Sequence, residues 1–62
     1  MEHVNGFVMD AMIKLDQQGH CTIANTKNAL SVMQNIHSQL PDYIRKNTFI
    51  TTDNKSVSIK YY

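Results

Sequence analysis

The C-terminal segment Thr48–Tyr62 limits the possible folds most strongly, because it reads as β-structure in a chain that otherwise reads as helix. Its sequence, TFITTDNKSVSIKYY, has two runs rich in Thr, Ile, Val and aromatic residues on either side of the turn-forming pair Asp53-Asn54. A two-stranded hairpin alone is only marginally stable in water. The hairpin must therefore pack against helices or against another chain.

The turn position predicts the register of this hairpin. If Asp53-Asn54 forms a two-residue type I′ loop, Ile50 pairs with Val57, and a free strand edge remains beyond the second strand. Phe49 and Tyr62 then lie on the mostly polar face of the ribbon, where we expect them to contact another molecule. The opposite face carries Ile50, Val57, Ile59 and Tyr61.

A first helix is predicted from about Glu2 to Gln18, or from a later start with Asn5 as its N-terminal cap. Gly19 is expected to end it in a left-handed conformation. Residues with helical spacing form one apolar stripe. These are Val4, Phe7, Val8, Ala11, Met12 and Leu15.

Met9 and Ile13 lie outside that stripe, on a second apolar face of the same helix, one turn apart. Two explanations are open for this surplus. The rest of the chain covers both faces of the helix, or Met9 and Ile13 pack against a second copy. We predict the second arrangement, in which Met9 and Ile13 form a dimer interface.

A second helix is predicted after the connector His20–Ile23, with Thr22 or Asn25 as its cap, and it runs to about Gln39. Together the two helices make an αα-hairpin. One side of the second helix is apolar, with Ala29, Leu30, Val32, Met33, Ile36, His37 and Leu40.

Pro41 marks the boundary after this helix and can open a single short helical turn over Pro41–Lys46. Asp42 lies near the positive end of this turn, and Arg45 lies near its negative end. The predicted fold is therefore α+β in one domain, residues 1–62. It has an αα-hairpin, a short third helical turn and a C-terminal β-hairpin, and we expect it to be dimeric.

The size of the chain favours oligomerisation. A chain of 62 residues supplies a core worth only about 3–5 kcal/mol, and small proteins add disulfides, metals or subunits to it. Cys21 is the single cysteine, which excludes an intrachain disulfide and fits a reducing compartment. No apolar run approaches the ~20 residues of a membrane span. We expect a soluble, cytoplasmic dimer.

The sequence contains no motif that predicts catalysis or cofactor binding. His20 and Cys21 are adjacent, but His3 and His37 are distant in sequence, and structural zinc sites use closely spaced ligand pairs. The five acidic residues are isolated from one another. We therefore predict no enzyme activity, no metal, no cofactor and no small-molecule substrate. His37 is expected to be half-buried and hydrogen-bonded, with a pH-sensitive interface residue as the alternative.

The preferred functional hypothesis is a small regulatory protein that homodimerises and binds another protein. It rests on the small core, the surplus apolar face and the predicted free strand edge, which is a template for pairing with another chain. Aromatic residues tend to anchor interfaces. The predicted partner-binding residues are Tyr43, Phe49, Tyr61 and Tyr62.

The alternative hypothesis is DNA binding, because the order helix, helix, short helix and hairpin resembles a winged helix-turn-helix protein. The resemblance implies base contacts by Asn25, Lys27, Asn28 or Ser31. It also implies phosphate contacts by Arg45, Lys46, Lys55 and Lys60. The segment after Pro41 is short for a recognition helix, and the formal net charge is only +1. Nucleic acid is therefore the less favoured partner.

Overall fold

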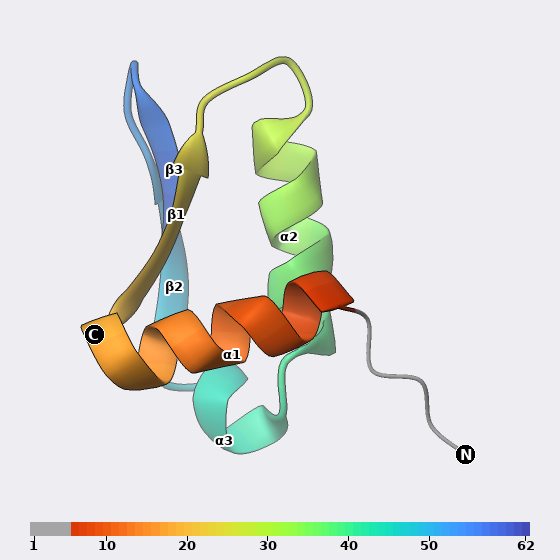
Figure 1. The fold of residues 1–62 in the computed structure, drawn as a ribbon, viewed down its shortest axis with the longest axis vertical. Coiled ribbons are helices and arrows are strands. Elements are labelled where there is room, and N and C mark those ends of the chain that lie inside the picture. Colours follow the sequence, from red (N-terminus) through yellow and green to blue (C-terminus); the bar gives the residue numbers. More distant parts are fainter. Residues whose placement is uncertain (1–5) are drawn as a thin grey trace.

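The computed structural model describes residues 6–62 of the chain. Three strands form one antiparallel sheet in the order β1-β3-β2, and the helices pack against one side of it (Figure 1). The fold is a small α+β arrangement, as predicted, with one strand more than predicted. The elements are α1 (Gly6–Gln18), β1 (His20–Ala24), α2 (Ala29–Gln39), α3 (Asp42–Arg45), β2 (Thr48–Thr52) and β3 (Ser56–Tyr61).

The additional strand is β1, which corrects the prediction of a simple connector between the first two helices. It pairs antiparallel with β3, so that Cys21 lies opposite Ile59 and Ile23 opposite Val57. Cys21 is buried, whereas Thr22 is exposed, as the alternation of a strand requires. The second strand of the hairpin is therefore central in the sheet, and the prediction that it has a free edge is wrong.

The hairpin register also differs from the prediction. Ile50 pairs with Ile59 rather than with Val57, a shift of two residues along β3. A shift by an even number keeps every side chain on its predicted face, because strand side chains alternate with a period of two. Val57 and Ile59 accordingly point into the core, where both are fully buried.

The tip of the hairpin explains this shift. The Asp53 carboxylate accepts the backbone N–H groups of Lys55 and Ser56, at 2.7 Å each. An aspartate side chain that bonds to nearby backbone in this way makes a turn without left-handed residues. Among residues 6–62 only glycine has a positive φ, at Gly19, so the predicted type I′ loop is wrong.

The Asp53 turn predicts a titration at low pH. The two N–H donors lower the pKa of Asp53 below its usual value of 3.8. A pKa that is lowered by folding adds stability above the unfolded-state pKa, and this stability is lost as the pH falls through the folded-state pKa. In NMR titrations, the Lys55 and Ser56 amide shifts should follow the Asp53 carboxyl group with a midpoint below 3.8. Asp53→Asn should abolish that transition, and a midpoint at or above 3.8 would contradict the turn.

Helix α1 ends where the sequence predicts. Gly19 follows it with φ 81°, a left-handed conformation that glycine adopts without strain. The predicted start at Glu2, the cap at Asn5 and the contribution of Val4 lie outside the described residues. Phe7 was assigned to the buried stripe but is 71% exposed.

Helix α2 ends at Gln39 as predicted but begins later, at Ala29, with Asn28 in the cap position. The predicted cap residues serve the sheet instead. Thr22 lies within β1, and the Asn25 side chain donates a hydrogen bond to the Asp53 carbonyl at the hairpin tip (2.6 Å).

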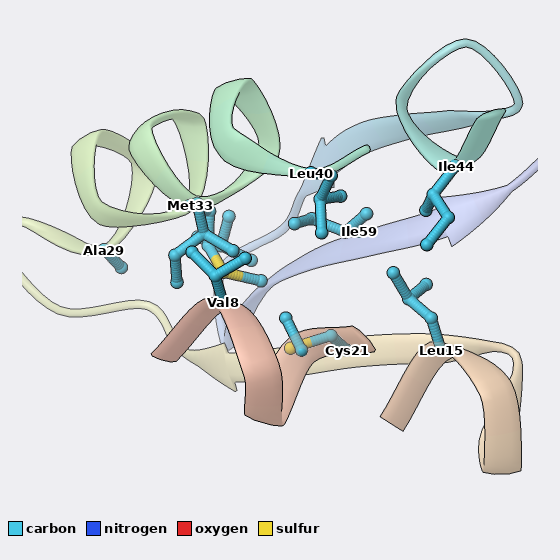
Figure 2. Packing of buried hydrophobic residues seen from close by; sticks show 11 residues of the cluster. Val8, Leu15, Cys21, Ala29, Met33, Leu40, Ile44 and Ile59 are labelled. Carbon is cyan, nitrogen blue, oxygen red and sulfur yellow. The ribbon is translucent and has the colours of Figure 1, made fainter. Parts of the chain in front are cut away.

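The core lies between α1, α2 and the inner face of the sheet (Figure 2). Leu30 and Val32, which were assigned to the apolar side of α2, are exposed rather than buried. The buried apolar residues are Val8, Ala11, Leu15, Cys21, Ala29, Met33, Ile36, Leu40, Ile44, Val57 and Ile59.

Helix α3 confirms the predicted short turn after Pro41. Arg45 forms an ion pair with Asp42, and its guanidinium donates to the carbonyls of Ser38 (3.4 Å) and Leu40 (3.2 Å). A cation is favourable at this position because the last carbonyls of a helix carry partial negative charge. Arg45 thereby fixes α3 to the end of α2.

His37 is half-buried and hydrogen-bonded, as predicted. Its Nε2 lies 3.1 Å from the hydroxyl of Thr48, and that hydroxyl donates to the Ile44 carbonyl (2.9 Å). Because the hydroxyl has a single proton, His37 Nε2–H is the donor to Thr48. The histidine therefore connects α2 to the start of β2.

Candidate protein-binding surface

A hollow of about 360 Å³ lies between the outer side of α1, the helix α3 and the end of β3. We call it the α1–α3 hollow. Its walls are mainly apolar. The lining residues are Met9, Met12, Ile13, Asp16, Gln17, Tyr43, Ile44 and Tyr61.

Each wall follows from local structure. Met9 and Ile13 are one helical turn apart on α1 and face away from the core residues Val8 and Leu15. Ile44 is buried, and its neighbour Tyr43 on α3 is 68% exposed. Tyr43 therefore stands at the rim of the hollow, above a buried apolar residue.

Tyr61 reaches the hollow because of its position in β3. It lies on the same face of the sheet as Ile59, as predicted, but at the end of the strand, where the core no longer covers it. The side chain is therefore partly exposed although it belongs to the inner face.

The hollow brings together two sets of residues for which the sequence predicts different roles. Met9 and Ile13 were predicted for a dimer interface, whereas Tyr43 and Tyr61 were predicted for partner binding. In the structure these four exposed apolar side chains surround one concave surface. Exposed apolar patches of this kind mark interaction sites.

The other two predicted partner-binding residues lie elsewhere. Phe49 and Tyr62 contact each other on the outer face of the sheet, with ring centroids 5.0 Å apart and the rings tilted by 33°. Phe49 pairs with Lys60 in the sheet, which places that lysine on the same outer face. The predicted partner residues therefore lie on two surfaces, and the one with Tyr43 and Tyr61 is concave.

Three residues of the hollow were not among the predicted site residues, namely the polar Asp16 and Gln17 and the buried Ile44. Asp16 takes part in neither of the ion pairs that residues 6–62 form. Asp10, the other acidic residue of α1, is instead paired with Lys14 (3.1 Å), and this hydrogen bond raises the pKa of Lys14. The hollow thus carries one carboxylate that is open to a cationic group of a ligand.

The residues predicted for DNA binding do not gather on one surface. Lys27 and Lys55 belong to the end of the sheet where Asn25 N–H bonds to the Lys55 carbonyl (2.9 Å). Arg45 and Lys46 lie in or next to α3, at the opposite end of the molecule (Figure 1), and Lys60 is on the outer sheet face. A protein surface that binds DNA by displacing the counterions of its phosphates needs its basic side chains side by side.

Cys21 does not have the environment of a nucleophile. It lies within β1 rather than near a helix start, and burial raises the pKa of its thiol. The His20 ring, next in sequence, bonds instead to the hydroxyl of Thr22 (3.1 Å). Within residues 6–62, no three His, Cys, Asp or Glu side chains are placed to share a metal ion.

None of the helices in residues 6–62 combines the length and the apolar character needed to cross a bilayer. Comparison of the chain with protein-family models, with curated protein sequences and with solved structures gives no match. The case for a function therefore rests on the α1–α3 hollow and the surfaces around it.

Proposed function

We propose that this chain is a small non-enzymatic regulatory protein that homodimerises and binds a protein partner at the α1–α3 hollow. The observation that carries the proposal is the concave grouping of Met9, Ile13, Tyr43 and Tyr61, all of them large, apolar and exposed. Aromatic residues around a pocket are typical anchors of protein interfaces.

The shape of the hollow favours a convex partner. In a twofold dimer each hollow would have to be filled by a side chain that protrudes from the same patch of the other subunit, whereas Met9, Ile13, Tyr43 and Tyr61 form the walls of the hollow. A protruding apolar side chain of another protein fills such a space and removes apolar surface from water. Met9 and Ile13 therefore suit a partner protein better than a second copy.

The charge of the hollow limits the chemistry of this partner. Asp16 is the one charged side chain among the lining residues, and it is without an ion pair in the described part of the chain. An acidic group beside an apolar recess favours a segment that carries an apolar anchor next to lysine or arginine.

A matched pair of substitutions tests the hollow. Ile13→Asp places a charge on its wall, whereas Leu30→Asp places the same charge at an equally exposed apolar position on α2, away from it. Proteins retained by immobilised wild-type chain should be quantified by mass spectrometry against both variants. A true partner should be lost at least about tenfold with Ile13→Asp and retained with Leu30→Asp. Equal retention by both variants would show that the hollow is not the docking surface.

DNA binding is the second candidate, and β1 is the observation that favours it. The order of the helices and the terminal hairpin resembles a winged-helix protein. The pairing of β1 with β3 adds a third strand to the sheet that contains this hairpin. Binding to duplex DNA should weaken steeply with salt and with Lys27→Ala or Arg45→Ala. An absence of retardation of duplex DNA at low salt would exclude this candidate.

A further inference from the structure

The strand β2 is an edge strand with unpaired backbone groups. Its single strand neighbour in the sheet is β3. Asp53 N–H bonds to the Ser56 carbonyl, and Tyr62 N–H bonds to the Asn47 carbonyl. Antiparallel ladders alternate, so the odd-numbered residues of β2 bond to β3, and Ile50 and Thr52 direct their N–H and C=O groups away from it.

This edge also lacks the features that protect exposed strands. Its sequence is TFITT, with no charged residue and no proline, and its pairing with β3 runs without a bulge. No turn or loop within residues 6–62 bonds to the backbone of Ile50 or Thr52.

The opposite edge of the sheet, formed by β1, is different. Asn25 N–H bonds to the Lys55 carbonyl, so the alternation of the antiparallel ladder directs the carbonyl of the preceding residue, Ala24, outward. This carbonyl already accepts the Thr26 N–H (2.9 Å). The β1 edge therefore presents fewer free groups to another strand.

We infer that the β2 edge pairs with β2 of a second copy across a twofold axis at Thr51, giving a continuous six-stranded sheet from two three-stranded ones. This inference rests on the homodimer of the proposed function and specifies the contact that would hold the two copies together. Ile50 lies opposite Thr52 of the second copy, and each of the two such pairs exchanges two N–H···O=C bonds. Thr48 is only 3% exposed and lies outside this contact.

The second copy is the occupant that the chemistry of the edge selects. The free N–H and C=O groups of Ile50 and Thr52 match the backbone spacing of another extended strand. An antiparallel pair of identical strands matches each donor to an acceptor, and the uncharged side chains of β2 bring no like charges together. The α1–α3 hollow is lined by α1, α3 and Tyr61, so this dimer leaves it open to a protein partner.

Thr52→Pro tests the contact without removing a bond to β3, because the Thr52 N–H points outward. Ala24→Pro is the matched control, since its N–H points outward at the β1 edge. Light scattering over a dilution series should give twice the 7.1 kDa chain mass for the wild type and for Ala24→Pro. It should give a single chain mass for Thr52→Pro, with circular dichroism confirming that the variant is folded.

Ile13→Asp separates this inference from the proposed function, and it should leave the doubled mass unchanged. A dimer that survives Thr52→Pro but is lost with Ile13→Asp would overturn the β2 contact and place the dimer at the hollow. A wild-type monomer would overturn the dimer itself while leaving partner binding at the hollow open to its own test.

Hydrogen exchange of the wild type gives a second measurement, which needs no variant. The Ile50 and Thr52 amides should be protected in concentrated samples and lose this protection on dilution, whereas the Phe49 and Thr51 amides should stay protected. Concentration-independent exchange at Ile50 and Thr52 would overturn the β2 contact.

Discussion

Leu15→Ala is expected to lower the free energy of unfolding by about 2–5 kcal/mol, because it deletes a buried side chain and leaves a cavity. Leu15 is 2% exposed, and in Figure 2 it points from α1 toward Ile44 of α3. A domain of this size holds only about 3–5 kcal/mol from its core. The variant should therefore be largely unfolded without denaturant, as urea titrations followed by circular dichroism would show.

Leu30→Ala is the control for this substitution. It removes the same atoms from a leucine that is 43% exposed on α2, and surface substitutions usually change stability by less than about 0.5 kcal/mol. Both variants should be measured at one protein concentration, because the proposed dimerisation would make apparent stability concentration-dependent. Equal losses in the two variants would mean that the core is not centred where the structure places it.

The Leu15 result also bears on the hollow. Ile44 belongs both to the core and to the hollow, and Leu15 points toward it within the core (Figure 2). Conditions that keep Leu15→Ala folded should still show weaker partner binding, although Leu15 does not line the hollow.

The faces of the hairpin could be predicted from the sequence, but its register could not. Alternation alone assigns Val57 and Ile59 to the core, and a slip of two residues leaves this assignment intact. The register depends on the turn. There the Asp53 carboxylate accepts the N–H groups of Lys55 and Ser56, whereas a type I′ loop needs left-handed residues. The rule that a pair such as Asp53-Asn54 forms a type I′ loop does not include these local hydrogen bonds of the Asp53 side chain.

The strand β1 was missed because its partner is distant in sequence. The segment HCTIA does alternate, with Cys21 and Ile23 on one side and His20 and Thr22 on the other. Five residues between two helices serve equally well as a connector, and only pairing with β3 distinguishes the two. This pairing is a tertiary contact, which local propensity does not predict.

The hollow could be predicted in part. Helical spacing shows Met9 and Ile13 to be surplus to the core, and alternation places Tyr61 beside Ile59. Nothing in the sequence shows that α3 brings Tyr43 to the same place, because that depends on the path of the chain through β1. The same limit explains Leu30, since a helical wheel does not show how much of an apolar side the rest of the fold covers.

Ile23→Pro is expected to destabilise the protein by roughly 2–4 kcal/mol, because Ile23 bonds to the central strand. Asn25 N–H donates to the Lys55 carbonyl, and the alternation of the ladder then directs Ile23 N–H to the Val57 carbonyl. Val57 is fully buried, so water cannot replace the donor that proline removes. The lost packing of the partly buried isoleucine adds to this cost, and Ile23→Ala measures that part separately.

Ala24→Pro is the matched control, one residue away. Its N–H points away from β3, and the preceding residue is already extended, as a residue before proline prefers. We expect it to cost less than about 1 kcal/mol in the same urea titrations. A flexible connector between α1 and α2 would tolerate proline equally at both positions. A large difference between the two variants therefore measures what the β1–β3 ladder adds to the fold, and equal effects would remove β1 from the sheet.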